Sequence, residues 1–229
     1  MLAWWSKLES LDLPLFPLNT VLFPGMALPL HIFEGRYLQM IDDCLNKTRQ
    51  FGVVLARPER EALPEGYSIG TSALITHVER LKDGHLDIFT AGLERFRVLD
   101  WIRTEPYAVG RIEPFPLEDT QAKELVGLVR AASGYFVRYL RLAGDVLGTV
   151  IRVDHAPEDA STLAYMMAIA LQISNEEKQG LLGIASLPLL LWKEAAIMSR
   201  EEVLLARMKT AQEEQAVYIR GIRDWLSLN

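Results

Sequence analysis

The sequence predicts an α+β protein: a β-rich first half, folded as a small barrel or curled mixed sheet, followed by an all-helical second half. Three observations predict this class. Four prolines interrupt an apolar segment near the start, the dipeptide Asp83-Gly84 lies between two β-rich runs, and apolar residues recur with helical spacing after about residue 120. The two halves meet near residues 114–120, at the sequence PFPLEDT.

The first segment, LPLFPLNTVLFPGMALPLHIFEGRYLQMI (13–41), is apolar but cannot form a continuous helix. Prolines at 14, 17, 24 and 29 exclude a membrane-spanning helix, and the preceding MLAWWSKLESLDL lacks the basic start of a secretory signal. The segment is therefore predicted to form two short strands, LPLFPL and MALPLHI. A turn at FPGM joins them, because Pro24 fixes φ and Gly25 can take a positive φ.

The chain then changes period for one helix before it returns to strands. FGVVLA (51–56) is predicted to be a buried strand, and RPEREALPEGYS that follows it a polar loop. Cys44 is interpreted as a small buried side chain rather than a reactive thiol. The helix is predicted to start near Tyr37. Its apolar face has the spacing i, i+3, i+4 and i+7, with Tyr37, Met40, Ile41 and Cys44.

Residues 67–114 are predicted to form a β-meander. ALITHVERL and HLDIFTAG flank Lys-Asp-Gly, which is a strong hairpin signal. RFRVLDWI and YAVGRIEP follow as further strands, and Pro106 and Pro114 mark their boundaries.

The second half is predicted to be helical throughout. A second helix is expected from about Pro157 to Ile173, and Ser174 with Glu177 has the spacing of a capping box for a third. The face of the second helix carries Leu163, Met166, Met167, Ala170 and Leu171. Before these two, the helical half begins with a long helix whose amphipathic face is made of Leu125, Leu128, Val129, Ala132, Phe136, Tyr139 and Leu140.

The last part of the sequence permits two interpretations. LLL, AIM and VLL begin at 189, 196 and 203, seven residues apart, which indicates one long helix towards Trp225. Alternatively, Ser199 with Glu202 could cap a new helix at that point. The sequence alone does not decide between them.

Composition limits the function classes. Half of the 229 residues are hydrophobic, so one large or two small domains can form a core without metals or disulfides. The formal net charge of −6 argues against general nucleic-acid binding, which needs a basic face. With a single cysteine and no visible export signal, a cytoplasmic protein that does not enter a membrane is expected.

The sequence contains no recognisable site for catalysis, a cofactor or a metal. None of the 15 glycines precedes a lysine, so a standard Walker nucleotide site is excluded, and neither G-x-G-x-x-G nor G-x-S-x-G occurs. The four histidines lack the three-to-five-residue spacing of paired metal ligands. His31 shares a metal-like spacing with Glu34, but a hydrogen-bonded structural histidine is the preferred interpretation.

The first half resembles the amino-terminal, substrate-binding domain of the Lon protease family. The resemblance rests on LPLFPLNTVLFPGMALPLHIFEGRY (13–37), GYSIGTSA (66–73), DGHLDIFTAGLERFRV (83–98) and EPYAVGRIEP (105–114), in that order, and more loosely on EEKQGLLG (176–183). Gly35 departs from the pattern, since the family commonly has proline there.

The resemblance implies a PUA-like β-barrel at 1–117 and a helical bundle with a long C-terminal helix at 118–229. In Lon proteases this domain precedes an ATPase module and a serine–lysine peptidase module. We expect both to be absent here, as in a stand-alone member of the family, so the chain is expected not to be an enzyme. Its family label of ATP-dependent protease would then come from its relatives.

The leading hypothesis is a non-catalytic module that binds polypeptide, either exposed apolar segments of unfolded or tagged proteins or a protein partner. Aromatic residues in such a segment belong to the core more often than to a contact surface. Arg36, Glu94 and Arg95 are expected to hold the barrel through ion pairs or turns. The candidate contact residues are Phe16, Leu22, Phe23, Met26 and Phe33.

Two other function classes and one assembly state stay open at this point. A PUA-like barrel could bind RNA, with Arg57, Arg60, Arg95 and Arg97 as the residues to inspect, although the acidic charge lowers this expectation. A peptidase or other enzyme would need a site outside known patterns. The arm with Trp4, Trp5, Leu8 and Leu11, or the last helix, could also support a homodimer.

Overall fold

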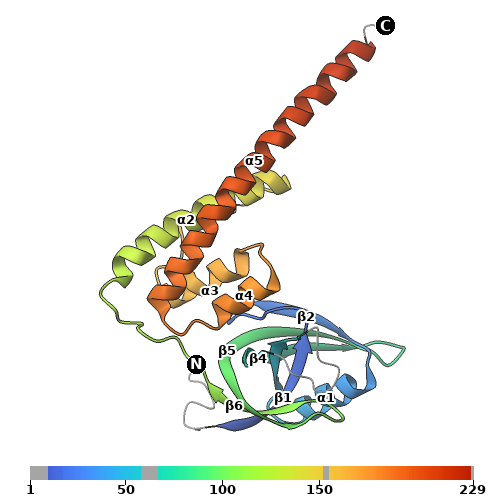
Figure 1. Cartoon of the computed structure of the whole chain (residues 1–229). Coiled ribbons are helices and arrows are strands. Elements are labelled where there is room, and N and C mark those ends of the chain that lie inside the picture. Colours follow the sequence, from blue (N-terminus) through green and yellow to red (C-terminus); the bar gives the residue numbers. More distant parts are fainter. Residues whose placement is uncertain (1–9, 58–66, 152–154, 228–229) are drawn as a thin grey trace. The chain divides into compact units, whose positions relative to one another are not determined.

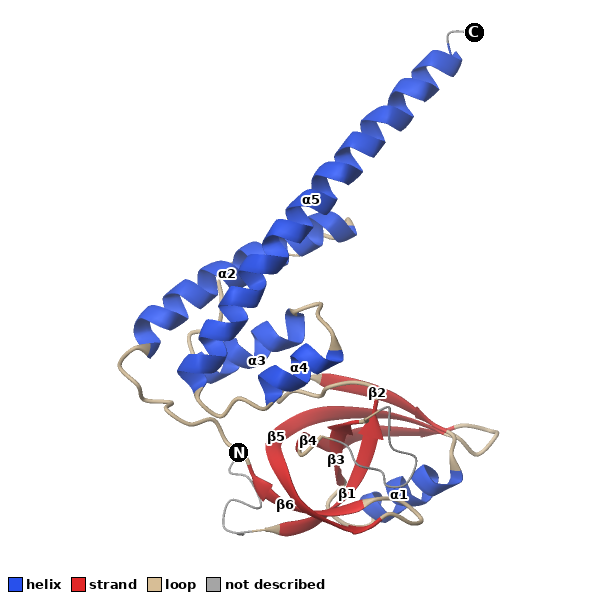
Figure 2. Cartoon of the chain, viewed as in Figure 1, coloured by secondary structure: helices blue, strands red, loops and turns tan. Residues whose placement is uncertain are grey.

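The predicted α+β class, with a curled mixed sheet in the first half and a long C-terminal helix, is confirmed. The computed structural model describes residues 10–57, 67–151 and 155–227 (Figure 1). Strands dominate the first half and helices the second (Figure 2). The arm residues Trp4, Trp5 and Leu8 lie outside the described residues.

The chain divides by its internal contacts into two compact units. The barrel unit contains the described residues up to Glu118 together with Gln172–Ala185. The helical unit contains the described residues of Asp119–Leu171 and those from Ser186 onward. The expectation of two domains that meet at 117/118 stays a prediction. In the structure, the short segment Gln172–Ala185 packs with the barrel although it comes later in the sequence.

The six strands of the barrel unit form one mixed sheet with the order β2-β5-β4-β3-β1-β6, in which β5 also pairs with β6. The pairing of β1 with β3 is parallel, and the other pairings are antiparallel. The strands are β1 (Leu11–Leu18), β2 (Ala27–Ile32), β3 (Gln50–Leu55), β4 (Ile69–Arg80), β5 (Leu86–Arg103) and β6 (Val109–Pro114).

Strand β5 closes the barrel because it changes partner halfway along. Residues 86–91 pair with β2, whereas residues from Phe96 to Arg103 pair with β6. Strands β5, β4, β3, β1 and β6 therefore form a closed ring, and β2 lies at an edge outside it. The sequence predicts two strands at HLDIFTAG and RFRVLDWI, but the continuous ladder with β4 joins them into one strand of 18 residues.

The proline-rich start forms the two strands and the turn that its sequence predicts. Gly25 has a φ of 81°, and the Met26 N–H donates to the Phe23 carbonyl at 3.1 Å. The turn packs against β5, because the Gly25 N–H donates to the Gly92 carbonyl at 2.9 Å and the Gly92 N–H to the Met26 carbonyl at 2.8 Å. The turn and the middle of β5 are thereby joined through backbone groups alone.

Helix α1 (Gly35–Leu45) packs on the sheet through Met40, Ile41 and Cys44, as the spacing predicts. It begins two residues before the predicted start at Tyr37. Burial, followed by the nearby Asp43 carboxylate, raises the pKa of the Cys44 thiol to about 12. The interpretation of Cys44 as a buried, unreactive side chain is therefore confirmed.

Helix α4 (Asn175–Leu182) belongs to the barrel unit and begins with the predicted capping box, in which Ser174 and Glu177 each accept from the other's backbone N–H. The Gln179 side chain donates to the Ile69 carbonyl at 3.0 Å. These contacts explain why a helix remote in sequence joins the sheet.

Arg95 anchors the end of α4. Its guanidinium is 3% exposed and donates to the carbonyls of Leu182, at 2.9 Å, and Ile184, and it lies 4.8 Å from the centroid of the Phe115 ring. Arg36 pairs with Glu34 at 2.8 Å, and the Glu94 N–H donates to Ser72 Oγ. The expectation that these positions hold the barrel together is consistent with these contacts.

Replacing Arg95 by methionine is expected to destabilise the α4 segment by about 2 kcal/mol, since two carbonyls lose a charged donor. Hydrogen exchange of the α4 amides should accelerate about tenfold or more, while exchange in β3 changes less. Arg97→Met is the matched control, because Arg97 is half-exposed and pairs with Glu113 on the surface. Equal effects of the two substitutions would contradict an anchoring role for Arg95.

The helical unit consists of α2 (Leu125–Leu147), α3 (Ala160–Ala170) and α5 (Leu187–Ser227). Helix α3 is three residues shorter at each end than predicted, because Asp159 caps its start and Leu171 leaves helical geometry. Met166, which was assigned to its apolar face, is 42% exposed. Helix α5 is continuous through Ser199, so the structure favours the single long helix over a new start there.

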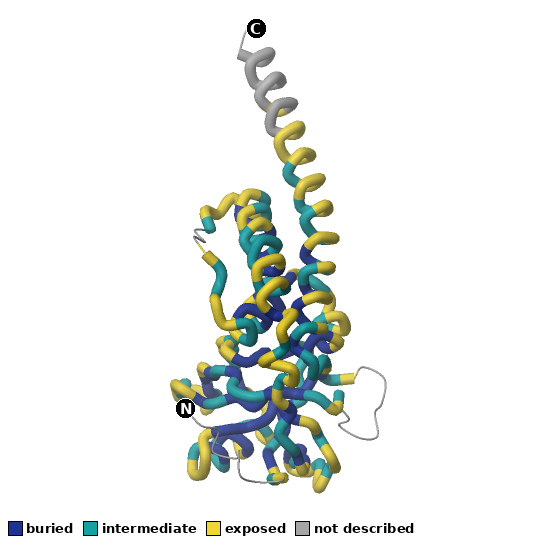
Figure 3. The backbone as a smooth tube through the Cα atoms, turned by 90° about the vertical axis from the view of Figure 1, so that its left-hand side faces the viewer, coloured by how far each residue is buried: buried dark blue, intermediate teal, exposed yellow. Residues whose placement is uncertain are grey.

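Helices α2 and α5 pack along each other up to the end of α2. Arg138 pairs with Glu202, and Lys209 Nζ lies 2.7 Å from Asp145. The Gln212 side chain donates to the Val146 carbonyl at 3.3 Å. The described residues that follow in α5 are exposed, which Figure 3 shows as a predominantly yellow tube.

Candidate functional site

Three of the five predicted contact residues lie in the core. Phe16 is 6% exposed, and Leu22 and Phe23 are each 1% exposed. The Phe16 ring stacks on Tyr37 with centroids 4.1 Å apart. These side chains stabilise the barrel and are not accessible to a ligand in this conformation. Phe16 is buried because a strand of a small barrel directs alternate residues inward, whereas Leu22 and Phe23 are buried in the connection between β1 and β2.

The other two predicted residues reach the surface to different extents. Phe33, which follows β2, is 59% exposed, whereas Met26 is half-buried and packs on the core. Phe33 is therefore the predicted residue around which an accessible site can be built.

The surface around Phe33 contains more aromatic rings from β2, β4 and β5. The strand register places Pro29 opposite Phe89 and His31 opposite Asp87. Phe89 is 52% exposed. This surface, called the aromatic face below, consists of Pro29, His31, Phe33, His77, His85 and Phe89.

The rings of the aromatic face contact one another. His31 lies 6.0 Å from Phe33 and 5.4 Å from His85, measured between ring centroids. His77 and Phe89 form a second pair at 6.1 Å. The rings thus form two groups, and Pro29, which pairs with Phe89 in the ladder, lies two residues from His31.

Two of the histidines of the face, His31 and His85, lie beside carboxylates. His31 Nδ1 lies 2.6 Å from Asp87 Oδ1, and His85 Nδ1 lies 3.1 Å from Asp83 Oδ2. The preferred interpretation of His31 as a hydrogen-bonded residue agrees with this geometry. Among the described residues, the face therefore combines apolar rings with negative charge at its rim.

Sequence reasoning missed Phe89 and the histidines beside it. Alternation along β5 was a usable signal: Leu86 and Ile88 point inward, so Asp87 and Phe89 share the outer side. Their closeness to Phe33 could not be predicted, because it depends on the pairing of β2 with β5 across about 60 residues of sequence.

A small hollow of about 250 Å³ in the barrel unit contains Cys44, Asp43, Lys47 and Tyr107. The Tyr107 hydroxyl donates to Asp43 Oδ2 at 2.6 Å. Burial, together with this hydrogen bond, raises the pKa of Tyr107 to about 12. The raised pKa values of Cys44 and Tyr107 keep the thiol and the phenol protonated at neutral pH.

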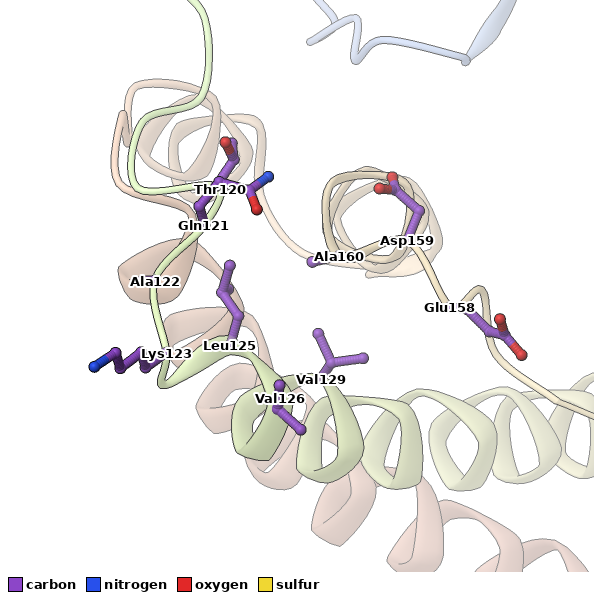
Figure 4. A pocket seen from close by; sticks show the side chains of 10 residues that line it. All are labelled: Thr120, Gln121, Ala122, Lys123, Leu125, Val126, Val129, Glu158, Asp159 and Ala160. Carbon is purple, nitrogen blue, oxygen red and sulfur yellow. The ribbon is translucent and has the colours of Figure 1, made fainter.

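A larger hollow, of about 540 Å³, lies between the starts of α2 and α3 in the helical unit. In Figure 4, Leu125 and Val129 point into it, whereas Lys123 and Glu158 extend away. Asp159 is engaged as the cap of α3: it accepts from the Thr162 N–H at 2.8 Å, and hydrogen bonds from Thr162 lower its pKa. The hollow therefore has a mixed polar and apolar lining, and the charged side chains of Lys123 and Glu158 do not converge in it.

A third hollow, of about 450 Å³, runs between α2 and α5. Its lining includes the small side chains of Ala131, Ala195 and Ser199 and the ring of Trp192, which is 61% exposed. It is apolar, but nothing in the structure indicates what covers it.

Other kinds of site find little support in the described part of the chain. No cluster of three or more metal-ligating residues occurs there, and none of its helices is long and apolar enough to cross a membrane. Of the arginines considered for RNA, Arg95 is buried, Arg97 pairs with Glu113, and Arg57 lies over the Tyr67 ring. Arg60 lies outside the described residues.

Comparison with protein families identifies the chain's relatives. Residues 12–200 match the family model described as the ATP-dependent protease La (LON) substrate-binding domain. Lon protease 2 of Herpetosiphon aurantiacus is 26% identical over 200 residues, and Lon protease of Roseiflexus castenholzii is 29% identical over 211 residues. These matches cover 86% and 89% of this chain but only 24% and 26% of the relatives. The chain thus spans about a quarter of their length.

Solved structures agree with this similarity. The Lon N-terminal domain protein from Xanthomonas campestris matches with a TM-score of 0.58 and 26% identity, over 81% of this chain and 98% of that one. The N-terminal domain of the Mycobacterium avium complex Lon protease matches in fold with a TM-score of 0.61 at 21% identity, over 82% of this chain and 98% of that one. The matched part of the relatives is the substrate-binding domain and not the catalytic part. The chain belongs to the Lon substrate-binding domain family.

Proposed function

We propose that this chain is a non-catalytic binding module that takes up apolar segments of unfolded polypeptide on its aromatic face. Membership of a substrate-binding domain family supports a binding role. We choose the aromatic face because Phe33, directly after β2, and Phe89, on the neighbouring strand β5, are 59% and 52% exposed.

The chemistry of the aromatic face suits such a ligand. Exposed aromatic rings provide large contact areas at a low cost in side-chain entropy, and they bind many apolar side chains rather than one sequence. A surface of this kind is expected to bind weakly and with broad specificity.

The test is calorimetric titration of the whole chain with reduced, carboxamidomethylated lysozyme, a basic protein that stays unfolded. Replacing Phe33 and Phe89 together by serine is expected to weaken binding about tenfold or more, since each ring acts as an anchor worth about 1 kcal/mol or more. The melting temperature should stay nearly unchanged, because both side chains are half-exposed or more.

The matched control is the double substitution Leu99→Ser and Ile102→Ser. These residues are also exposed, at 50% and 40%, and lie on the other half of β5. They are expected to leave the affinity unchanged. An equal loss in both double variants would contradict the choice of the aromatic face, and an absence of binding by the unaltered chain at high micromolar concentration would contradict the proposed function.

A further inference from the structure

Strand β2 has an open edge. Among the described strands it pairs with β5 alone, and it lies at the end of the strand order, outside the closed ring (Figure 1). An edge strand presents backbone N–H and C=O groups to which another extended chain can add.

The ladder register tells which backbone groups of β2 face outward. The Gly92 N–H donates to the Met26 carbonyl, and Thr90 Oγ1 donates to the Leu28 carbonyl, so the even-numbered residues of β2 direct their backbone groups towards β5. In an antiparallel pair the residues between them direct theirs the other way. These residues are Ala27, Pro29 and His31.

The outward backbone groups of β2 can form hydrogen bonds with an added strand, except that one N–H donor is missing. Ala27 and His31 each offer an N–H and a C=O, whereas Pro29 offers only its carbonyl. Within the described residues, none of these outward groups makes a backbone hydrogen bond outside the ladder with β5. A proline in this place also hinders the pairing of two β2 edges from different molecules.

The aromatic face borders this edge. The side chains of Pro29, His31 and Phe33 stand on the outer side of β2, directly beside the open backbone groups. A strand that adds to β2 continues the sheet, so its alternate side chains lie next to these rings. Backbone pairing and side-chain contact can therefore be made by the same bound segment.

The charge at the rim favours one class of segment. The carboxylates of Asp87 and Asp83 lie beside the rings of His31 and His85, with their side chains 43% and 59% exposed. An apolar segment flanked by lysine or arginine is complementary to this rim, whereas an acidic segment is repelled.

From these observations we infer that the open edge of β2 takes up an extended segment of unfolded polypeptide as an added strand. The segment is apolar at alternate positions and basic at its flanks. This inference rests on the proposed function and adds the binding mode: backbone hydrogen bonds to Ala27, Pro29 and His31, with the aromatic face as the side-chain contact. Because the backbone provides much of the binding, many sequences can be accepted.

Hydrogen exchange of single amides tests the mode directly. The full chain, labelled with nitrogen-15, is saturated with reduced, carboxamidomethylated lysozyme, a basic unfolded protein, and amide exchange is followed by NMR. The Ala27 and His31 amides are expected to exchange at least tenfold more slowly in the complex. Binding without protection of these two amides would overturn the added strand and leave the proposed function intact.

Substitutions in the edge provide a second test. His31→Pro removes an outward N–H, and His31→Ala removes the same side chain but keeps the N–H. The proline variant is expected to bind at least fivefold more weakly than the alanine variant. Pro29→Val restores a donor and is expected to tighten binding about threefold. Equal affinities of the two His31 variants, together with no gain from Pro29→Val, would overturn the inference.

Two controls separate competing explanations. Sedimentation of the Pro29→Val variant detects pairing of β2 with a second copy, which would compete with the polypeptide for this edge. A dimer that binds the unfolded protein as tightly as the unaltered chain would count against a polypeptide ligand at this edge. Two short apolar peptides, one flanked by lysines and one by glutamates, test the charge preference. The lysine peptide is expected to bind at least fivefold more tightly, and the reverse order would contradict the basic flanks.

Discussion

Replacing Gly92 by alanine is expected to destabilise the protein by about 3 kcal/mol. A Cβ at this position would lie 2.3 Å from the Phe23 carbonyl oxygen, far inside contact distance. The turn that packs there must move, and the hydrogen bonds from Gly25 to Gly92 and from Gly92 to Met26 are then strained or lost. Thermal unfolding should show a midpoint lower by roughly 6–12 °C.

Gly180→Ala is the matched control for this effect. Gly180 lies in α4 of the same unit, and a Cβ there meets nothing within 4 Å. The substitution is expected to raise stability by about 0.5–1 kcal/mol, because alanine loses less backbone entropy in a helix. If Gly92→Ala unfolds at the same temperature as the unaltered protein, the close approach of the turn to β5 is not a constraint on the fold.

The stability of the helical unit is expected to fall as pH rises, because of one buried carboxyl group. Glu194 is fully buried in the apolar stripe of α5, beside Leu190, Leu191 and Met198. Among the described residues, neither of its carboxyl oxygens has a hydrogen-bond partner. Burial raises the pKa of Glu194 well above its ordinary value of 4.5.

The direction of the pH effect follows from proton binding. Between the ordinary pKa and the raised one, the folded protein keeps the proton and the unfolded chain releases it, so unfolding becomes more favourable as pH increases. The stabilising effect of the protonated form is complete at acidic pH, below 4.5, and is lost progressively above it.

Glu194→Gln is expected to stabilise the protein by about 2 kcal/mol at pH 8 and by much less at pH 5, because glutamine keeps the size but cannot ionise. Glu194→Met should stabilise at both pH values, since it also removes the unpaired polar atoms. Denaturant unfolding followed by circular dichroism measures both. The exposed Glu214→Gln in the same helix is the control, with no expected pH-dependent difference. A pH-independent stability in the unaltered protein would contradict the buried carboxyl as the cause.

Local patterns in the sequence identified most of the elements. The prolines and Gly25 predicted two strands and their turn, Asp83-Gly84 predicted the hairpin between β4 and β5, and Ser174 with Glu177 predicted the start of α4. Each of these signals acts through a few neighbouring residues, by steric restriction of the backbone or by a short-range hydrogen bond. They can therefore be evaluated without knowledge of distant contacts.

The candidate site was predicted less well, for a physical reason. An apolar residue in a strand has the same propensity whether it faces the core or the solvent, so Phe16 and Phe33 looked alike. Only the closure of the barrel separates them. Phe89 was missed because nothing near it in the sequence indicates that it lies beside β2.

By itself, the sequence determined the α+β class, the order of the strands and helices along the chain, and the family, because these depend on local backbone preferences and on ordered motifs. Tertiary structure alone decided which aromatic rings are accessible, that β5 is one strand with two partners, that α4 packs with the barrel, and that β2 keeps an open edge. These features arise from contacts between residues far apart in the chain, whose free energy is gained only when the whole barrel forms.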